Sequence, residues 1–123
     1  GLKWRLVVSL AEKDTEGWTN CGSPWEFMRK EDALHEVEMW KARLKIRRVA
    51  SVLGSGWNMT FPCWCIEVKE EDGRLLSRVK STEASTGAPG YFKSALHAAT
   101  AMKMIPKEVL KIASGFSQDQ LGL

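Results

Sequence analysis

The sequence predicts an α+β fold, in which an antiparallel sheet of four or more strands carries its helices on one face. Three observations lead to this prediction. Alternating apolar residues, typical of half-buried strands, occur in both halves of the chain, and each half continues into a segment with helical apolar spacing. An Ala-Leu-His sequence also occurs once in each half. We therefore expect two pseudo-repeated strand–strand–helix units and a C-terminal helix.

The repeated segment is Asp32–Lys41, which returns in variant form at Ser94–Lys103. An aromatic pair precedes each copy, and the second copy begins with a serine that suits a helix N-cap. At 123 residues the chain has the length of one domain. We expect this domain to contain two pseudo-repeats and a flexible tail, at residues 3–53, 60–114 and 115–123.

The first half is expected to form a strand at 3–10, a short returning strand at Trp18–Cys21 and an extended piece at Trp25–Met28. A helix should begin near Lys30 and end before Gly54-Ser55-Gly56. Acidic residues cluster at its start and basic residues at its end, which complements the helix dipole. The apolar stripe of this helix contains Ala33, Val37, Trp40, Leu44, Ile46, Val49 and Leu53.

The second half contains an Asp72-Gly73 dipeptide between two strand-like segments, which is typical of a type I′ hairpin turn. A two-residue turn places Glu71 opposite Arg74, and Glu67 opposite Arg78. A polar Ser/Thr/Gly/Pro loop at 81–90 follows the hairpin. Helices are then expected after Ser94 and after Pro106, which forces a break.

Composition limits the class of protein. An apolar fraction of 44% with six Trp predicts a folded core, and the net charge of +3 is lower than a dedicated duplex-DNA binder usually carries. Three cysteines without a CxxC pair favour a cytoplasmic protein over a disulfide framework. No apolar run reaches the length of a membrane span and no signal-peptide pattern begins the chain, so we expect no membrane association. One interpretation of Gly1-Leu2 is a cloning remnant.

A family resemblance covers residues 60–103. The sequence Asp72-Gly73-Arg74-Leu75-Leu76, followed by Gly90-Tyr91-Phe92-Lys93-Ser94-Ala95 and Ala98-Ala99, is similar to the tandem modules of the YegP-like bacterial family. In those modules a hairpin with a DG or NG turn precedes a GY-x-S-x-x-A helix start. The first half lacks this turn and the Gly-Tyr pair. The resemblance implies an α+β tandem repeat without an assigned activity.

Residues suited to catalysis are few. His35 and His97 hold equivalent places in the two copies, but no nucleophile or orienting carboxylate accompanies them in the sequence. Cys63 and Cys65 share one face of a strand, where two thiols behave as small apolar side chains more often than as half of a zinc site. We therefore predict a protein that is not an enzyme and that holds no metal or cofactor.

Two binding hypotheses remain open. The first is a small binding module, an accessory protein of a bacterium, phage or mobile element, that contacts a protein partner or forms a homodimer. Loop tryptophans would anchor this interface, namely Trp18, Trp25 and Trp57. The alternative is a nucleic-acid binder that uses the basic end of the first helix. Its candidate residues are Lys41, Arg43, Lys45, Arg47 and Arg48.

Overall fold

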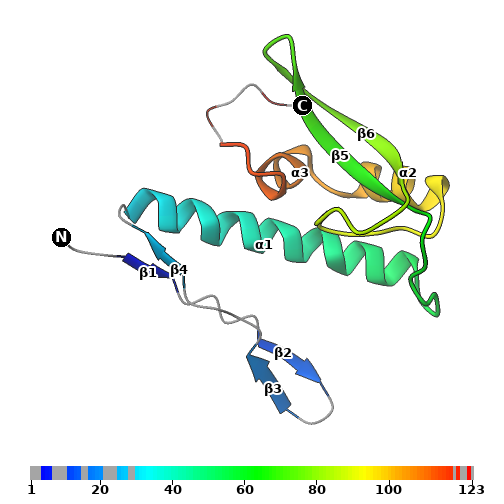
Figure 1. The fold of residues 1–123 in the computed structure, drawn as a ribbon, viewed down its shortest axis with the longest axis horizontal. Helices are drawn as coiled ribbons and strands as arrows, with labels where there is room; N and C mark the ends of the chain where they lie inside the picture. The colour runs from blue at the N-terminus through cyan, green and yellow to red at the C-terminus, as the bar shows by residue number, and fades with distance from the viewer. Residues whose placement is uncertain are drawn as a thin grey trace. The chain divides into compact units, whose positions relative to one another are not determined.

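The computed structural model describes residues 30–117, 119 and 122 with their side chains, and it describes the backbone alone at 4–6, 11–14, 17–20 and 25–27 (Figure 1). The chain forms two compact units, Gly1–Val37 and Glu38–Leu123. The second unit contains the last four turns of the long helix, a hairpin and two further helices.

Four short strands belong to the first unit. Strand β1 (Trp4–Leu6) pairs antiparallel with β4 (Trp25–Phe27), while β2 (Ala11–Asp14) pairs with β3 (Gly17–Asn20). The expected returning strand near residue 18 and the extended piece at residue 25 are therefore present. The partner expected for the returning strand is wrong, because β3 pairs with the adjacent segment 11–14. Closing the shorter loop costs less conformational entropy than pairing with residues 3–10.

Helix α1 (Lys30–Leu53) begins where the sequence predicts. Within the second unit its most buried residues are Ala42 and Ile46, while Val49, Ala50 and Leu53 pack against the same core at partial exposure. These residues recur at intervals of three or four, so they lie along one side of the helix. The expected stripe is thus observed from Ile46 onward.

The hairpin of β5 (Cys63–Glu71) and β6 (Arg74–Thr82) has the predicted register. Glu71 faces Arg74, Ile66 faces Val79 and Glu67 faces Arg78. The turn residues Asp72 and Gly73 have φ of 52° and 76°, the left-handed values that a type I′ turn requires. Arg78 and Glu67 form an ion pair of 2.8 Å across the two strands.

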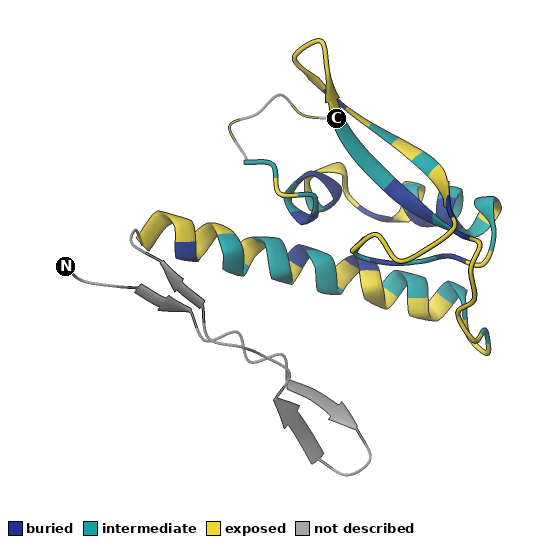
Figure 2. Ribbon diagram, viewed as in Figure 1, coloured by how far each residue is buried: buried dark blue, intermediate teal, exposed yellow. Residues whose placement is uncertain are grey.

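Helices α2 (Ala95–Met104) and α3 (Lys107–Ala113) complete the second unit. The Ser94 hydroxyl accepts a hydrogen bond of 3.1 Å from the His97 amide, which confirms the predicted N-cap. Just before this helix, Phe92 pairs with Trp64 through two backbone hydrogen bonds of 2.7 and 2.9 Å. Phe92 is 2% exposed and packs with Ile66, Ala98 and Leu110. Figure 2 shows this buried core where the end of the hairpin remote from its turn meets α2 and α3.

The expected architecture is wrong in two respects, although the α+β class is confirmed. Every sheet among the described residues has two strands, so no sheet of four or more strands forms there. The two pseudo-repeated units are also absent. The second half has nine-residue strands joined by one tight turn, whereas the first half has three- and four-residue strands paired in nested order. A similar helix sequence therefore follows two different strand arrangements.

Candidate binding site

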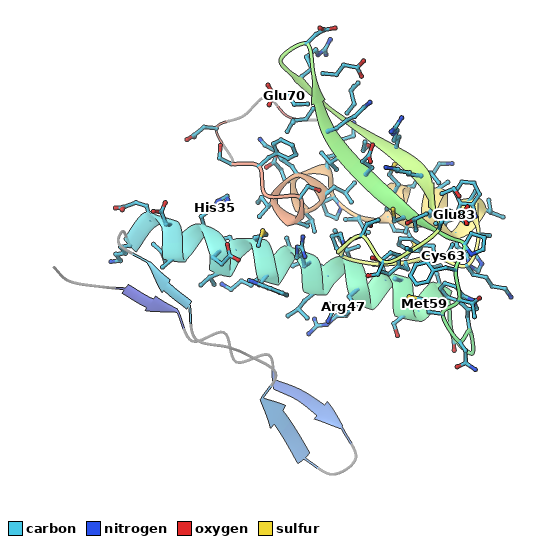
Figure 3. The ribbon with its side chains drawn as sticks, in the orientation of Figure 1. His35, Arg47, Met59, Cys63, Glu70 and Glu83 are labelled. Atoms are coloured by element: carbon cyan, nitrogen blue, oxygen red, sulfur yellow. The ribbon has the colours of Figure 1, made fainter. Side chains whose placement is uncertain are left out.

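An open groove of about 580 Å³ lies between the C-terminal turns of α1 and the segment that leads into α2. One side chain in its lining is charged, that of Arg47, and the remainder are small, hydroxylated or aromatic, apart from the long apolar side chain of Met59. Arg47 projects from α1, and Met59 lies beside the C-terminal part of the same helix (Figure 3). The complete lining consists of Arg47, Ala50, Ser51, Gly54, Ser55, Gly56, Trp57, Met59, Ala88, Pro89, Gly90 and Tyr91.

The end of α1 places Trp57 in this groove. The Gly54 amide donates to the Ala50 carbonyl at 2.9 Å, and the Trp57 amide then donates to the Gly54 carbonyl at 2.9 Å, which turns the chain back towards the helix. Gly56 has a φ of 81° and provides the left-handed residue that this turn needs. A Cβ on Gly54 would lie 3.5 Å from Cε3 of Trp57. The indole ring is therefore packed on the helix end.

Segment 85–91 forms the opposite side of the groove. Gly90 is buried against α1, where an added Cβ would lie 3.2 Å from Cβ of Ala50 and 3.3 Å from Cγ2 of Ile46. The absence of a side chain thus allows the backbone of this segment to contact the helix directly. The sequence predicts a polar loop here, and the structure shows that this loop packs against α1 at Gly90.

The Tyr91 hydroxyl organises this segment from within. It accepts hydrogen bonds from the amides of Thr86 at 2.8 Å and Ala88 at 3.3 Å, and its oxygen lies 3.2 Å from the Ser85 hydroxyl. Burial raises the pKa of Tyr91, but the hydrogen bonds with Ser85, Thr86 and Ala88 outweigh it, so the pKa lies below its ordinary value. One side chain therefore fixes the shape of a seven-residue segment.

Apolar side chains are exposed close to the groove. Met59, in the groove lining, is 53% exposed. Phe61 is 37% exposed and meets the Tyr91 ring edge-on, with ring centroids 5.6 Å apart. Met59 and Phe61 thus add exposed apolar surface beside the groove, which a partner could cover.

The structure brings together two residues from the different sequence hypotheses. Trp57, predicted as an interface anchor, and Arg47, predicted as a phosphate contact, line the same groove. Trp18 and Trp25 belong to β3 and β4, but their side chains lie outside what the structure describes. Nothing here tests those two positions as anchors.

The other four basic candidates separate by environment. Arg43 is half-buried, donates from Nε to the Ala113 carbonyl at 3.1 Å and lies 5.7 Å from the centre of the Trp40 ring. It therefore joins α1 to the end of α3. Lys41 forms an exposed ion pair of 3.3 Å with Glu38. Lys45 and Arg48 are exposed and, with Lys41, follow a spacing of four and three that places them on one face of α1.

The histidines and cysteines described with their side chains are not among the residues that line the groove. His35 is exposed, and His97 is half-buried with an Nδ1 atom that has no hydrogen-bond partner. Cys63 and Cys65 are both buried, and burial raises the pKa of each thiol, so both are protonated at neutral pH. Among the described residues, no group of three or more His, Cys, Asp or Glu side chains is arranged to hold a metal ion.

Sequence reasoning missed Met59, Pro89 and Tyr91 as members of the groove. The available signal was the small residue at position 90 preceding a tyrosine, after a helix that ends in Gly54-Ser55-Gly56. A glycine permits close backbone contact, but it does not indicate that α1 is the element contacted.

Comparison of the chain with models of protein families, with curated proteins and with solved structures finds no match. The YegP-like resemblance stays a prediction. In the portions of the chain that the structure describes, no helix has both the length and the apolar character needed to span a membrane.

Proposed function

We propose that this chain is a non-enzymatic binding module whose groove receives a segment of a partner protein carrying an apolar side chain and a carboxylate. The observation that carries the proposal is the combination of Trp57, Met59 and Tyr91 with one arginine, Arg47, in a single groove. Tryptophan, tyrosine and arginine are the residues that most often dominate the energy of protein interfaces.

The apolar side chains exposed at the groove are the reason for proposing an apolar side chain on the partner. Covering Met59 and its neighbours removes apolar area from water, and each Å² contributes about 25 cal/mol. Trp57 and Tyr91 are half-buried, and packing and hydrogen bonds hold them, so little side-chain entropy is lost when a partner binds.

The positive charge at the groove is the reason for proposing a carboxylate on the partner. Arg47 is exposed at the groove and can make a bidentate pair with a carboxylate. The unit Glu38–Leu123 contains 13 Lys and Arg against eight Asp and Glu, a net charge of +5, whereas Gly1–Val37 contains five against seven, a net charge of −2. An acidic partner is therefore attracted to the unit that bears the groove.

A displayed library of random peptides, selected on the purified chain, tests the proposal. We expect the enriched peptides to combine an aromatic or long aliphatic residue with Asp or Glu, and to lose at least tenfold in affinity when Trp57 is replaced by Ala. Arg47→Glu should abolish binding. The matched control is Arg48→Glu, which makes the same charge change at an exposed residue outside the groove lining. Equal losses with the two variants would contradict a groove site.

Nucleic-acid binding is the second candidate, and it uses a different face. Lys41, Lys45 and Arg48 share the exposed side of α1 and are suited to contacting phosphates. A fluorescently labelled mixed-sequence RNA or DNA should then bind with a strong salt dependence. Here the same two variants give the opposite pattern, because Arg48→Glu should weaken nucleic-acid binding more than Arg47→Glu. No binding at 50 mM salt would eliminate this candidate.

A further inference from the structure

We propose that a second cavity, between the hairpin, segment 82–89, the middle of α1 at Arg43 and the end of α3, binds a phosphate or another small oxyanion. This cavity has a volume of about 240 Å³, enough for a phosphate group and part of the molecule that carries it. It does not include Trp57 or Arg47, so it is distinct from the groove. The proposal is independent of the partner protein discussed above.

Two cations reach this cavity from different elements. Arg43 comes from α1, and its Nε is engaged with the Ala113 carbonyl at 3.1 Å. Within residues 30–117 the structure gives its two terminal amino groups no hydrogen-bond partner. Lys80 comes from β6 and gives one of its three protons to Glu67 at 3.0 Å. Donors therefore remain on both side chains for an added acceptor.

The one carboxylate in the lining is already neutralised. Glu67 accepts from Arg78 on Oε1 at 2.8 Å and from Lys80 on Oε2 at 3.0 Å. Glu67, Arg78 and Lys80 together carry a net charge of +1, and Arg43 adds a further +1 beside the cavity. This excess of positive charge in a partly enclosed space favours an anion over a cation or an apolar ligand.

The remaining lining supplies hydroxyl groups and no further charge. Thr82, Thr86 and Ser114 contribute hydroxyls, and the Cys65 thiol is protonated at neutral pH because burial raises its pKa. Ser114 donates to the Leu110 carbonyl at 2.8 Å and Thr82 to the Ala84 carbonyl, so these two protons are already used and the donors for an anion are those of Arg43 and Lys80. Arg43 is half-buried and its Nε is bonded to the Ala113 carbonyl at 3.1 Å, so the guanidinium needs little reorganisation to receive a ligand.

Titration of the whole chain with inorganic phosphate in 150 mM chloride, followed by two-dimensional amide NMR, tests the site. We expect saturable shifts at Thr86 and Gly87, and a loss of tenfold or more in affinity for Lys80→Gln. Arg78→Gln is the matched control, because it removes an equal charge and a hydrogen bond to the same carboxylate but lies outside the cavity lining. Glycerol phosphate, titrated in parallel, reports whether an esterified phosphate is preferred to the free ion.

The outcomes are distinguishable. Shifts that do not saturate, or equal weakening by Lys80→Gln and Arg78→Gln, would show only general attraction to a basic surface and would overturn the proposal. Arg43→Lys provides a second test, since it keeps the charge but loses the planar donor array. Weaker phosphate binding by this variant, with an unchanged unfolding midpoint, supports the site. Failure of phosphate to bind leaves the peptide groove unaffected, because the two sites have different charged residues.

Discussion

Replacing Tyr91 by Phe removes one oxygen and keeps the ring. The edge-on contact with Phe61 at 5.6 Å is retained, while the hydroxyl contacts with Ser85, Thr86 and Ala88 are lost. Any effect of Tyr91→Phe on segment 85–91 therefore comes from these polar contacts.

The expected cost is about 1–2 kcal/mol. An intramolecular hydrogen bond contributes roughly 0.5–1.5 kcal/mol to stability, and the three contacts of this hydroxyl lie at exposed or partly buried positions where water replaces part of each. Urea unfolding should show this loss with an unchanged slope, since the surface exposed on unfolding is the same. The melting temperature should fall by about 5–10 °C.

Hydrogen exchange provides the decisive measurement for this variant. The amides of Thr86 and Ala88 should exchange faster in Tyr91→Phe than in the parent chain. The control is the amide of Phe92, which donates to the Trp64 carbonyl at 2.7 Å. Its exchange rate should be similar in the two chains once the difference in global stability is corrected for. Ser85→Ala is the milder comparison, because it removes one of the three contacts. Unchanged protection at Thr86 would refute the view that the hydroxyl organises the segment.

Three further predictions concern the second unit. Gly90→Ala should destabilise it by about 1 kcal/mol in urea unfolding, because the crowding at 3.2–3.3 Å costs roughly 1–3 kcal/mol and the stiffer unfolded chain offsets part of it; an unchanged or raised midpoint would contradict the close contact of Gly90 with α1. Cys63 should react with a thiol reagent at the rate of global unfolding, whereas fast labelling of this thiol in the native chain would contradict its burial. Hydrogen bonds from Lys80 and Arg78 lower the pKa of Glu67, so its contribution to stability is present above the ordinary pKa and disappears as the pH falls through the lowered value; Glu67→Gln should remove this part of the acid dependence, and an identical pH profile of stability for both chains would count against it.

Local signals in the sequence were sufficient where neighbouring residues decide the structure. The Asp72-Gly73 turn fixed the register of nine residues on either side of it, and Ser94 and Pro106 marked the helix starts. Each of these features depends on backbone conformations that one or two residues control.

Pairing between distant segments could not be predicted in the same way. The repeated Ala-Leu-His segment indicated two equal units, but the partner of a strand depends on which edges meet, and a three-residue strand has too few side chains to specify one. The groove was found only in part for a similar reason. Trp57 and Arg47 were recognised as suitable residue types, whereas the other side of their groove is formed by the contact of Gly90 with Ala50, 40 positions apart in the sequence.

The Tyr91-bound segment has one consequence for regulation. Ala88 and Pro89 line both the groove and the smaller cavity, so the two concavities share a single strip of backbone. A ligand that shifts or stiffens this strip at one site alters the free energy of binding at the other. Thermodynamic linkage requires that effect to be reciprocal. If both proposed ligands bind, phosphate should change the affinity for peptide by the same factor as peptide changes the affinity for phosphate.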